Sequence, residues 1–100
     1  MLELAIVLLG QVSNVPGAIG IRWSWMTDKI YRVYKDGPAD RAGIQVDDKI
    51  LKVRDDEGHS EISGDSGTYV NLTIKRDGKV LQFRILREPN SSIVREWRNR

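Results

Sequence analysis

The stretch TYVNLTIKRDGKVLQFRIL, residues 68–86, constrains the fold of this chain more than any other. Apolar and polar side chains alternate on both sides of Asp77-Gly78, and this period of two is typical of strands with one buried face. An Asp-Gly pair between two alternating stretches indicates a type I′ hairpin. We therefore predict an antiparallel hairpin from Val70 to Ile85, whose inward-facing residues are Val70, Leu72, Ile74, Leu81, Phe83 and Ile85.

Three further stretches have the apolar alternation of short strands, namely 18–26, 29–35 and 49–53. The first would place Ile19, Ile21, Trp23 and Trp25 on one face. The segment DGPADRAG between the second and third favours a short helix, because Pro38 suits a first helical turn and Gly43 a helix end. We expect a mainly β fold of five to six strands, a small barrel or sandwich, with one short helix at about residues 38–42.

We expect the core to come from the alternating apolar positions of these strands and from the end of the helix. The expected core residues are Ile30, Val33, Ile44, Ile50, Leu51, Val53, Leu72, Ile74 and Phe83.

The composition is that of one ordinary globular domain. The chain has 100 residues, a net charge of +2 and a pI of about 9.1. Such a weak basic bias without a clustered Lys/Arg stripe does not indicate a nucleic-acid partner. Cysteine is absent from the sequence, which excludes disulfides, thiol chemistry and cysteine-based zinc sites. No cofactor is expected.

The two ends of the chain leave alternatives open. The apolar run in MLELAIVLLGQVSNV, residues 1–15, is too short to span a bilayer and favours a buried strand, with a helix or a targeting remnant as alternatives. The tail, residues 88–100, begins where Pro89 breaks the last strand. It is either a frayed end or a docking segment that carries Ile93, Val94 and Trp97.

The string Gly64-Asp65-Ser66-Gly67 occurs around the nucleophile of trypsin-like proteases, and His59 lies seven residues before Ser66. A serine protease needs these groups far apart in sequence and held rigidly by the fold. Asp, Ser and Gly are also the residues that a turn favours, so we interpret the string as a turn and expect no catalytic residue. The acidic residues around His59 match no metal-binding pattern, so we expect a solvated loop there and no metal site.

The order of three motifs resembles the PDZ domain family, in the bacterial form found in HtrA proteases and C-terminal processing proteases. The motifs are AIGI at residues 18–21, the stretch GPADRAGIQVDDKILKV at 37–53, and the final hairpin. The resemblance implies a single PDZ-like domain over residues 1–100, with a core at about 16–87. Its fold would be a partly open barrel.

The resemblance also implies a function without catalysis. Family members bind extended peptides by β-augmentation at the second strand, with the peptide carboxylate held by the loop before it. The residues at the matching positions are Ala18, Ile19, Gly20, Ile21, Arg22 and Trp23. The implied partners are protein or peptide C-termini or internal extended segments.

The sequence departs from the family pattern at one wall of the groove. Family members have a second helix before the final hairpin, but residues 54–67 contain three glycines and a single aliphatic residue, Ile62. Such a segment lacks the apolar stripe with which a helix docks, so we expect the helix to be absent and the groove truncated.

The truncation leaves two functional hypotheses. The first is a peptide-binding module with a weak groove. The second is an assembly element whose strand edge is covered by the chain's own tail or by another copy in a homodimer. Residues 91–97 would then pack near Trp23 or Trp25.

Overall fold

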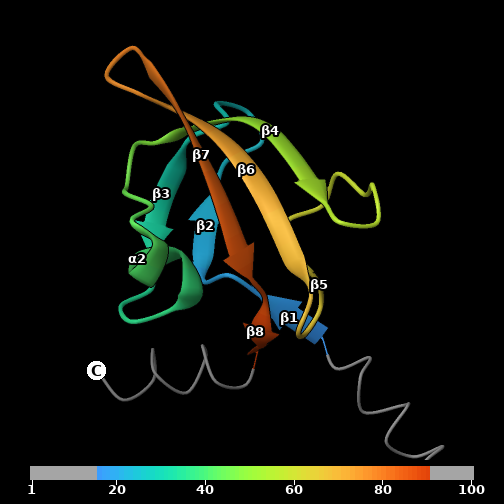
Figure 1. Cartoon of the computed structure of the whole chain (residues 1–100). Coiled ribbons are helices and arrows are strands. Elements are labelled where there is room, and N and C mark those ends of the chain that lie inside the picture. Colours follow the sequence, from blue (N-terminus) through green and yellow to red (C-terminus); the bar gives the residue numbers. More distant parts are fainter. Residues whose placement is uncertain (1–15, 91–100) are drawn as a thin grey trace, which may run out of the picture.

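The computed structural model describes residues 16–90, and the elements follow the order expected for a small β domain (Figure 1). They are β1 (Pro16–Ala18), β2 (Ile21–Trp23), β3 (Ile30–Val33), α2 (Pro38–Ala42), β4 (Lys49–Asp55), β5 (Gly64–Asp65), β6 (Tyr69–Arg76), β7 (Lys79–Leu86) and β8 (Glu88–Pro89). The mainly β class and the short helix at 38–42 are confirmed. The described residues form eight strands rather than five or six, because β5 and β8 are two-residue strands that alternation cannot reveal.

The β6–β7 hairpin is the longest ladder of the fold, and it pairs in unbroken register from Tyr69 opposite Leu86 to Arg76 opposite Lys79. Asp77 and Gly78 have φ of 51° and 78°. Positive φ at both central residues is the signature of the type I′ turn, whose twist matches that of the strands. The predicted hairpin is therefore confirmed.

Strand β4 pairs antiparallel with β6, but its register shifts between Ile50 and Lys52. Leu51 is the additional residue of this bulge and is 47% exposed. Its expected place in the core was wrong, because a bulge inserts one residue into the alternation and turns that residue outward.

The stretch 18–26 was expected to form one strand, and the structure divides it (Figure 1). Gly20, with φ of 80°, ends the extended course of β1, and β2 begins one residue later. Ser24 to Thr27 form the turn to β3, and this turn contains Trp25. The expectation that Trp25 belongs to the strand face was therefore wrong.

Strand β3 also departs from simple alternation. Arg22 pairs with Arg32 and Trp23 pairs with Ile30, so Tyr31 is an additional residue in β3. The bulge lets Ile30 and Val33 both contact the core, although the alternation had placed them on opposite faces. The strand covers 30–33 rather than the expected 29–35.

Strands β5, β1 and β8 form a small antiparallel sheet at one end of the domain (Figure 1). Gly17 of β1 pairs with Gly64 on one side and with Pro89 on the other. The GDSG string, predicted to be a turn, is thus part strand and part turn. The expectation that Pro89 breaks the last hairpin strand was wrong, because β7 ends at Leu86 and Pro89 lies in a separate strand, β8.

Helix α2 is short because its ends are defined by sequence. Pro38 occupies its first turn, and Gly43 closes it in the left-handed conformation with φ of 101°. The Ala39 N–H donates to the carbonyl of Ile19 at 2.8 Å. This bond ties the start of the helix to the loop between β1 and β2.

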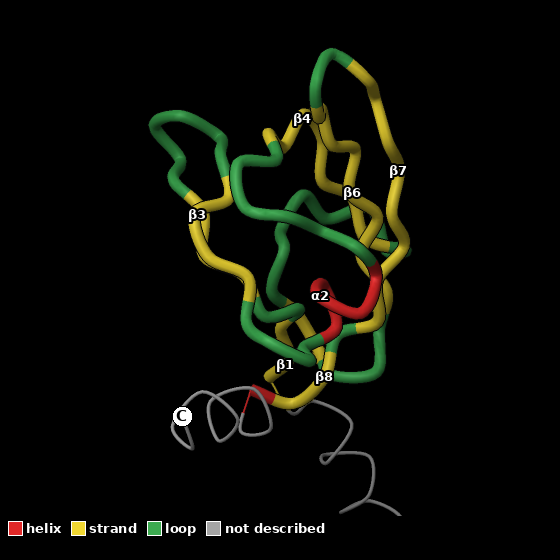
Figure 2. The backbone as a smooth tube through the Cα atoms, turned by 90° about the vertical axis from the view of Figure 1, so that its left-hand side faces the viewer, coloured by secondary structure: helices red, strands yellow, loops and turns green. Residues whose placement is uncertain are grey.

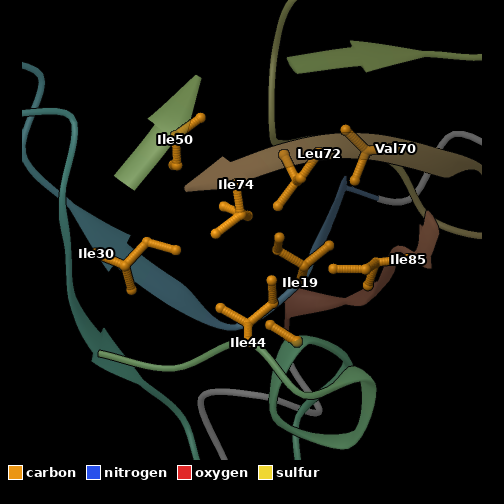
Figure 3. Packing of buried hydrophobic residues seen from close by; sticks show 9 residues of the cluster. Ile19, Ile30, Ile44, Ile50, Val70, Leu72, Ile74 and Ile85 are labelled. Carbon is orange, nitrogen blue, oxygen red and sulfur yellow. The ribbon is translucent and has the colours of Figure 1, made fainter. Parts of the chain in front are cut away.

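The core lies between the long sheet, β3 and α2, with Ile19 near its centre (Figure 3). Its buried members are Ile19, Ile30, Ala39, Ile44, Ile50, Val70, Leu72, Ile74 and Ile85. The expected residues Ile30, Ile44, Ile50, Leu72 and Ile74 are confirmed there. Val33, Val53 and Phe83 are partly buried against this cluster.

A buried carboxylate fixes the connection between α2 and the hairpin. Asp48 is 2% exposed and accepts two hydrogen bonds of 2.7 Å from the Arg76 guanidinium, and a third from the Gln45 N–H. Burial acts to raise the pKa of Asp48, but the bonds from Arg76 and Gln45 outweigh it and hold the pKa below its usual range. Arg76 also binds the Gly43 carbonyl at 2.9 Å, which anchors the helix end.

The predictions for residues 1–15 and 91–100, including the packing of residues 91–97 against Trp23 or Trp25, lie outside the described residues. In the part of the chain that the structure describes, no helix has the length and hydropathy needed to cross a bilayer.

We predict that Asp48→Asn lowers the free energy of unfolding by about 2 kcal/mol at pH 7. This is less than for a fully buried pair, because Arg76 keeps some contact with water. A carboxyl with a depressed folded-state pKa stabilises above its unfolded pKa, and that contribution is lost as pH falls through the folded pKa. Urea unfolding at pH 7 and pH 3 should show a smaller acid destabilisation in the variant.

The matched control is Asp47→Asn, which removes the same charge from the exposed neighbouring position. Equal effects of the two substitutions at pH 7 would contradict a structural role for the Asp48–Arg76 pair.

Candidate functional site

Strand β2 has one open edge. Among the described strands it pairs with β3 alone. The Gly20 carbonyl accepts from the Tyr34 N–H and the Ser24 N–H donates to the Lys29 carbonyl, so both groups face β3. Because backbone direction alternates along a strand, the N–H and C=O groups of Ile21 and Trp23 face the open edge. Such groups are a template for an added strand.

The loop before β2 is held from two sides. Its carbonyls at Ile19 and Gly20 accept from the N–H groups of Ala39 and Tyr34 at 2.8 and 2.9 Å. Gly20 takes a positive φ of 80°, which favours glycine. The loop therefore enters β2 in a defined conformation.

The six residues that the resemblance implies for peptide binding are in different environments. Ile19 is fully buried in the core, and Ile21 is partly buried against it. Ala18 is half-buried at the end of β1, and Gly20 is buried. Ile19 thus supports the strand from within, and Ile21 is the apolar side chain of this pair that keeps some exposure.

Arg22 and Trp23 lie at the surface of β2. Trp23 is 38% exposed. The Arg22 Nε donates to the Tyr34 hydroxyl at 2.9 Å, and this hydrogen bond raises the pKa of Arg22. Trp25, at 78% exposure, lies beyond the strand in the turn. The two tryptophans therefore do not form one continuous face with Ile19 and Ile21.

The segment between β4 and β5, residues 56–63, contains turns and no helix. Its first turn is organised by Asp55. The Oδ1 atom of Asp55 accepts from the N–H groups of Glu57 and His59 at 2.9 and 2.8 Å, and the Asp55 N–H donates to the His59 carbonyl. These are local bonds of the kind that Asp makes in tight turns.

The far side of the same segment is held by Arg87, whose side chain is 2% exposed. Its Nε donates to the Ile62 carbonyl, and its Nη2 donates to the Glu61 carbonyl and to Asp55 Oδ2. Its Nη1 donates to the Thr68 hydroxyl at 2.8 Å. One guanidinium thus binds the second end of the loop, the last residue of β4 and Thr68.

Two glycines make room for this arrangement. A Cβ added to Gly64 would lie 2.6 Å from the Arg87 guanidinium, and one added to Gly17 would lie 2.7 Å from the Ser66 backbone. Both distances are too short for any residue other than glycine without displacement. Gly17 therefore packs directly on the Ser66 backbone, and Gly64 on the Arg87 guanidinium.

The electrostatics of Asp55 follow from these contacts. Burial acts to raise the pKa of its carboxyl, but the backbone bonds from His59 and Glu57, together with the nearby imidazole, lower it below its usual value. On the solvent side of the loop, Asp56 accepts two bonds from Arg84 at 2.8 and 2.9 Å. These bonds lower the pKa of Asp56.

The potential ligand atoms of Asp55, Glu57 and His59 lie within 4.8 Å of one another. The loop explains this grouping, since the Asp55 carboxylate already accepts bonds from the Glu57 and His59 N–H groups. The His59 ring lies against Asp55 and Glu57, at 3.2 and 3.7 Å. The grouping therefore supports neither a metal site nor a catalytic triad.

Sequence reasoning missed Arg87 and Asp55, although a signal was present. Along β7 the inward positions are Phe83 and Ile85, and Arg87 continues this parity. Along β4, Asp55 continues the parity of Val53. Opposite charges at two inward-facing positions indicate a buried pair.

The family model described as PDZ domain matches residues 17–86, most of the described chain. The matched range includes the loop before β2, helix α2 and the whole β6–β7 hairpin. None of the curated proteins matches the chain.

We predict that Arg87→Met lowers the free energy of unfolding by about 3 kcal/mol, because it leaves the buried Asp55 carboxylate and two loop carbonyls without their donor. Hydrogen exchange should show faster exchange of the amides of Glu57 and His59. Arg54→Met, at an exposed position of β4, is the matched control. A loop that keeps its protection in Arg87→Met would show that the guanidinium does not organise it.

Proposed function

This chain belongs to the PDZ domain family, and we propose that it binds extended peptide segments by β-augmentation at the open edge of β2. PDZ domains are protein-interaction modules, which is the general function of this chain. The observation that carries the finer proposal is the outward direction of the Ile21 and Trp23 backbone groups on an edge without a described partner strand.

The proposed site comprises residues 18–23, which would have three different roles. The N–H groups around Ala18, Ile19 and Gly20 would receive the peptide carboxylate. The backbone of Ile21 and Trp23 would pair with the peptide, and the partly exposed side chains of Ile21, Arg22 and Trp23 would contact its side chains.

The groove is truncated in this proposal. The turns of residues 56–63 occupy the place in the sequence where other family members have a second helix. A peptide would then gain backbone hydrogen bonds along a three-residue strand but little burial from a second wall. We therefore propose weak binding, with Kd of roughly 0.1–1 mM.

A second proposal rests on the same open edge. An exposed edge favours pairing with any available strand, including that of another copy. In this alternative the β2 edge is permanently occupied, by the chain's own tail or in a homodimer, and the domain acts in assembly.

We predict that a C-terminal peptide library, titrated into labelled protein, shifts the amide signals of residues 18–23 more than those of β7. N-methylation of a bound peptide at an amide that faces β2 should abolish binding, since that hydrogen bond is lost. N-methylation at the next amide, which faces away, is the matched control. Equal effects of the two modifications would exclude strand addition.

The assembly alternative predicts a different result in solution. Light scattering at increasing concentration should show a dimer, or the amides of Ile21 and Trp23 should be protected from exchange in the monomer. A monomer in which these two amides exchange rapidly would exclude that alternative.

A further inference from the structure

Three lysines lie in one row across adjacent strands on the outer face of the sheet. Lys49 of β4 is directly opposite Lys75 of β6, and Lys29, just before β3, forms an isolated bridge with Lys49. Side chains of paired residues lie on the same face, so the three ammonium groups are neighbours. All three residues are exposed.

Directly opposed like charges destabilise a sheet. Within the described residues, none of Lys29, Lys49 and Lys75 forms an ion pair that would offset this repulsion. Two further cations, Lys52 and Arg54, are exposed on the same face of β4, opposite Thr73 and Asn71. A bound anion would relieve the repulsion among these lysines, so the row is well suited to binding one.

The row has apolar side chains at both ends. Val80, opposite Lys75 on β7, is 59% exposed. At the other end, the turn before Lys29 carries Trp25 and Met26, which are 78% and 76% exposed. The two hairpin turns lie at the end of the domain opposite to β1 and β8 (Figure 2).

The turn that presents Trp25 and Met26 is internally bonded. The Ser24 N–H donates to the Lys29 carbonyl and the Asp28 N–H donates to the Ser24 carbonyl, while the Ser24 hydroxyl accepts from the Met26 N–H. Because its own bonds hold the turn, the exposure of the two side chains belongs to a defined conformation. Large exposed apolar side chains in a structured turn commonly mark a contact surface.

The acidic residues at this end of the domain are favoured there by the backbone conformation of the turns. Asp28, Asp47 and Asp77 all occupy positive-φ positions in turns, with φ of 60°, 77° and 51°. Aspartate is among the few side chains that tolerate this region. They reduce the local net charge but leave the lysine row on the sheet face.

We propose that this surface, formed by Lys29, Lys49, Lys75, Trp25, Met26 and Val80, binds an anionic lipid membrane. Lysine ammonium groups near such a surface are attracted to its headgroups, and tryptophan favours the boundary between headgroups and acyl chains. A nucleic acid or an acidic peptide would account for the lysines but would leave Met26 and Val80 without a role. The inference is independent of peptide binding at β2.

The test uses the full chain and sedimented vesicles of phosphatidylcholine, with and without about one third phosphatidylserine. We expect binding to the anionic vesicles only, with a blue shift of tryptophan emission that is lost in Trp25→Ser. Lys75→Glu should weaken vesicle partitioning about 30-fold, since it changes two charges and each contributes roughly fivefold. It replaces a repulsive cross-strand pair by an attractive one, so lost binding would not reflect unfolding.

Lys35→Glu is the matched control, since Lys35 is exposed just beyond the opposite end of β3. It should weaken partitioning much less than Lys75→Glu. Equal effects of the two substitutions, equal binding to neutral vesicles, or binding to a single-stranded oligonucleotide without binding to vesicles would each overturn the proposal. Vesicle binding that survives both Lys75→Glu and Trp25→Ser would also overturn it, because the contact would then lie elsewhere in the chain.

Discussion

The hydrogen bonds of the buried Arg87 guanidinium hold together the loop 56–63, the end of β4 and Thr68, and this part of the domain depends on them. A segment of turns between two strands has carbonyl groups that no ladder can satisfy, and such groups are costly when buried. Arg87 donates to two of these carbonyls, to the Thr68 hydroxyl and to the Asp55 carboxylate. In a PDZ domain whose loop has no helix to satisfy its own backbone, a single side chain with five donors performs that task.

The regular parts of the fold could be predicted because their signals are local. Asp77-Gly78 determines a turn type, and Pro38 with Gly43 bounds a short helix. The Arg87 network is different, since its acceptors come from positions 19 to 32 residues away in the sequence. The inward parity of Arg87 and Asp55 indicates that the two charges pair, but it gives no sign of the loop carbonyls and the Thr68 hydroxyl that Arg87 also binds.

The loop before β2 was predictable in position but not in detail. The motif AIGI located the loop before β2 through the resemblance, yet alternation placed Trp23 and Trp25 on one face with Ile19. Gly20 with positive φ and the turn at 24–27 changed those directions, and the additional residue at Tyr31 changed the facing of positions in β3. A break or an additional residue in a strand reverses the facing of the positions after it. This is why periodicity finds strands more reliably than it assigns their faces.

The geometry of β2 sets the kind of binding that this domain can support. In the proposed binding mode, an added strand makes few backbone bonds to the three-residue edge and gains little burial from a second wall. A peptide bound in this way loses conformational entropy on ordering and gains few contacts to offset that loss. We therefore expect low affinity from the edge alone. A second contact on another face would change that balance, because two linked weak contacts act at a high effective concentration. The lysine row extends over β4 and β6, away from the open edge of β2, so in our proposals both surfaces are engaged at once. Weak peptide capture would then be selective for partners held at the same membrane.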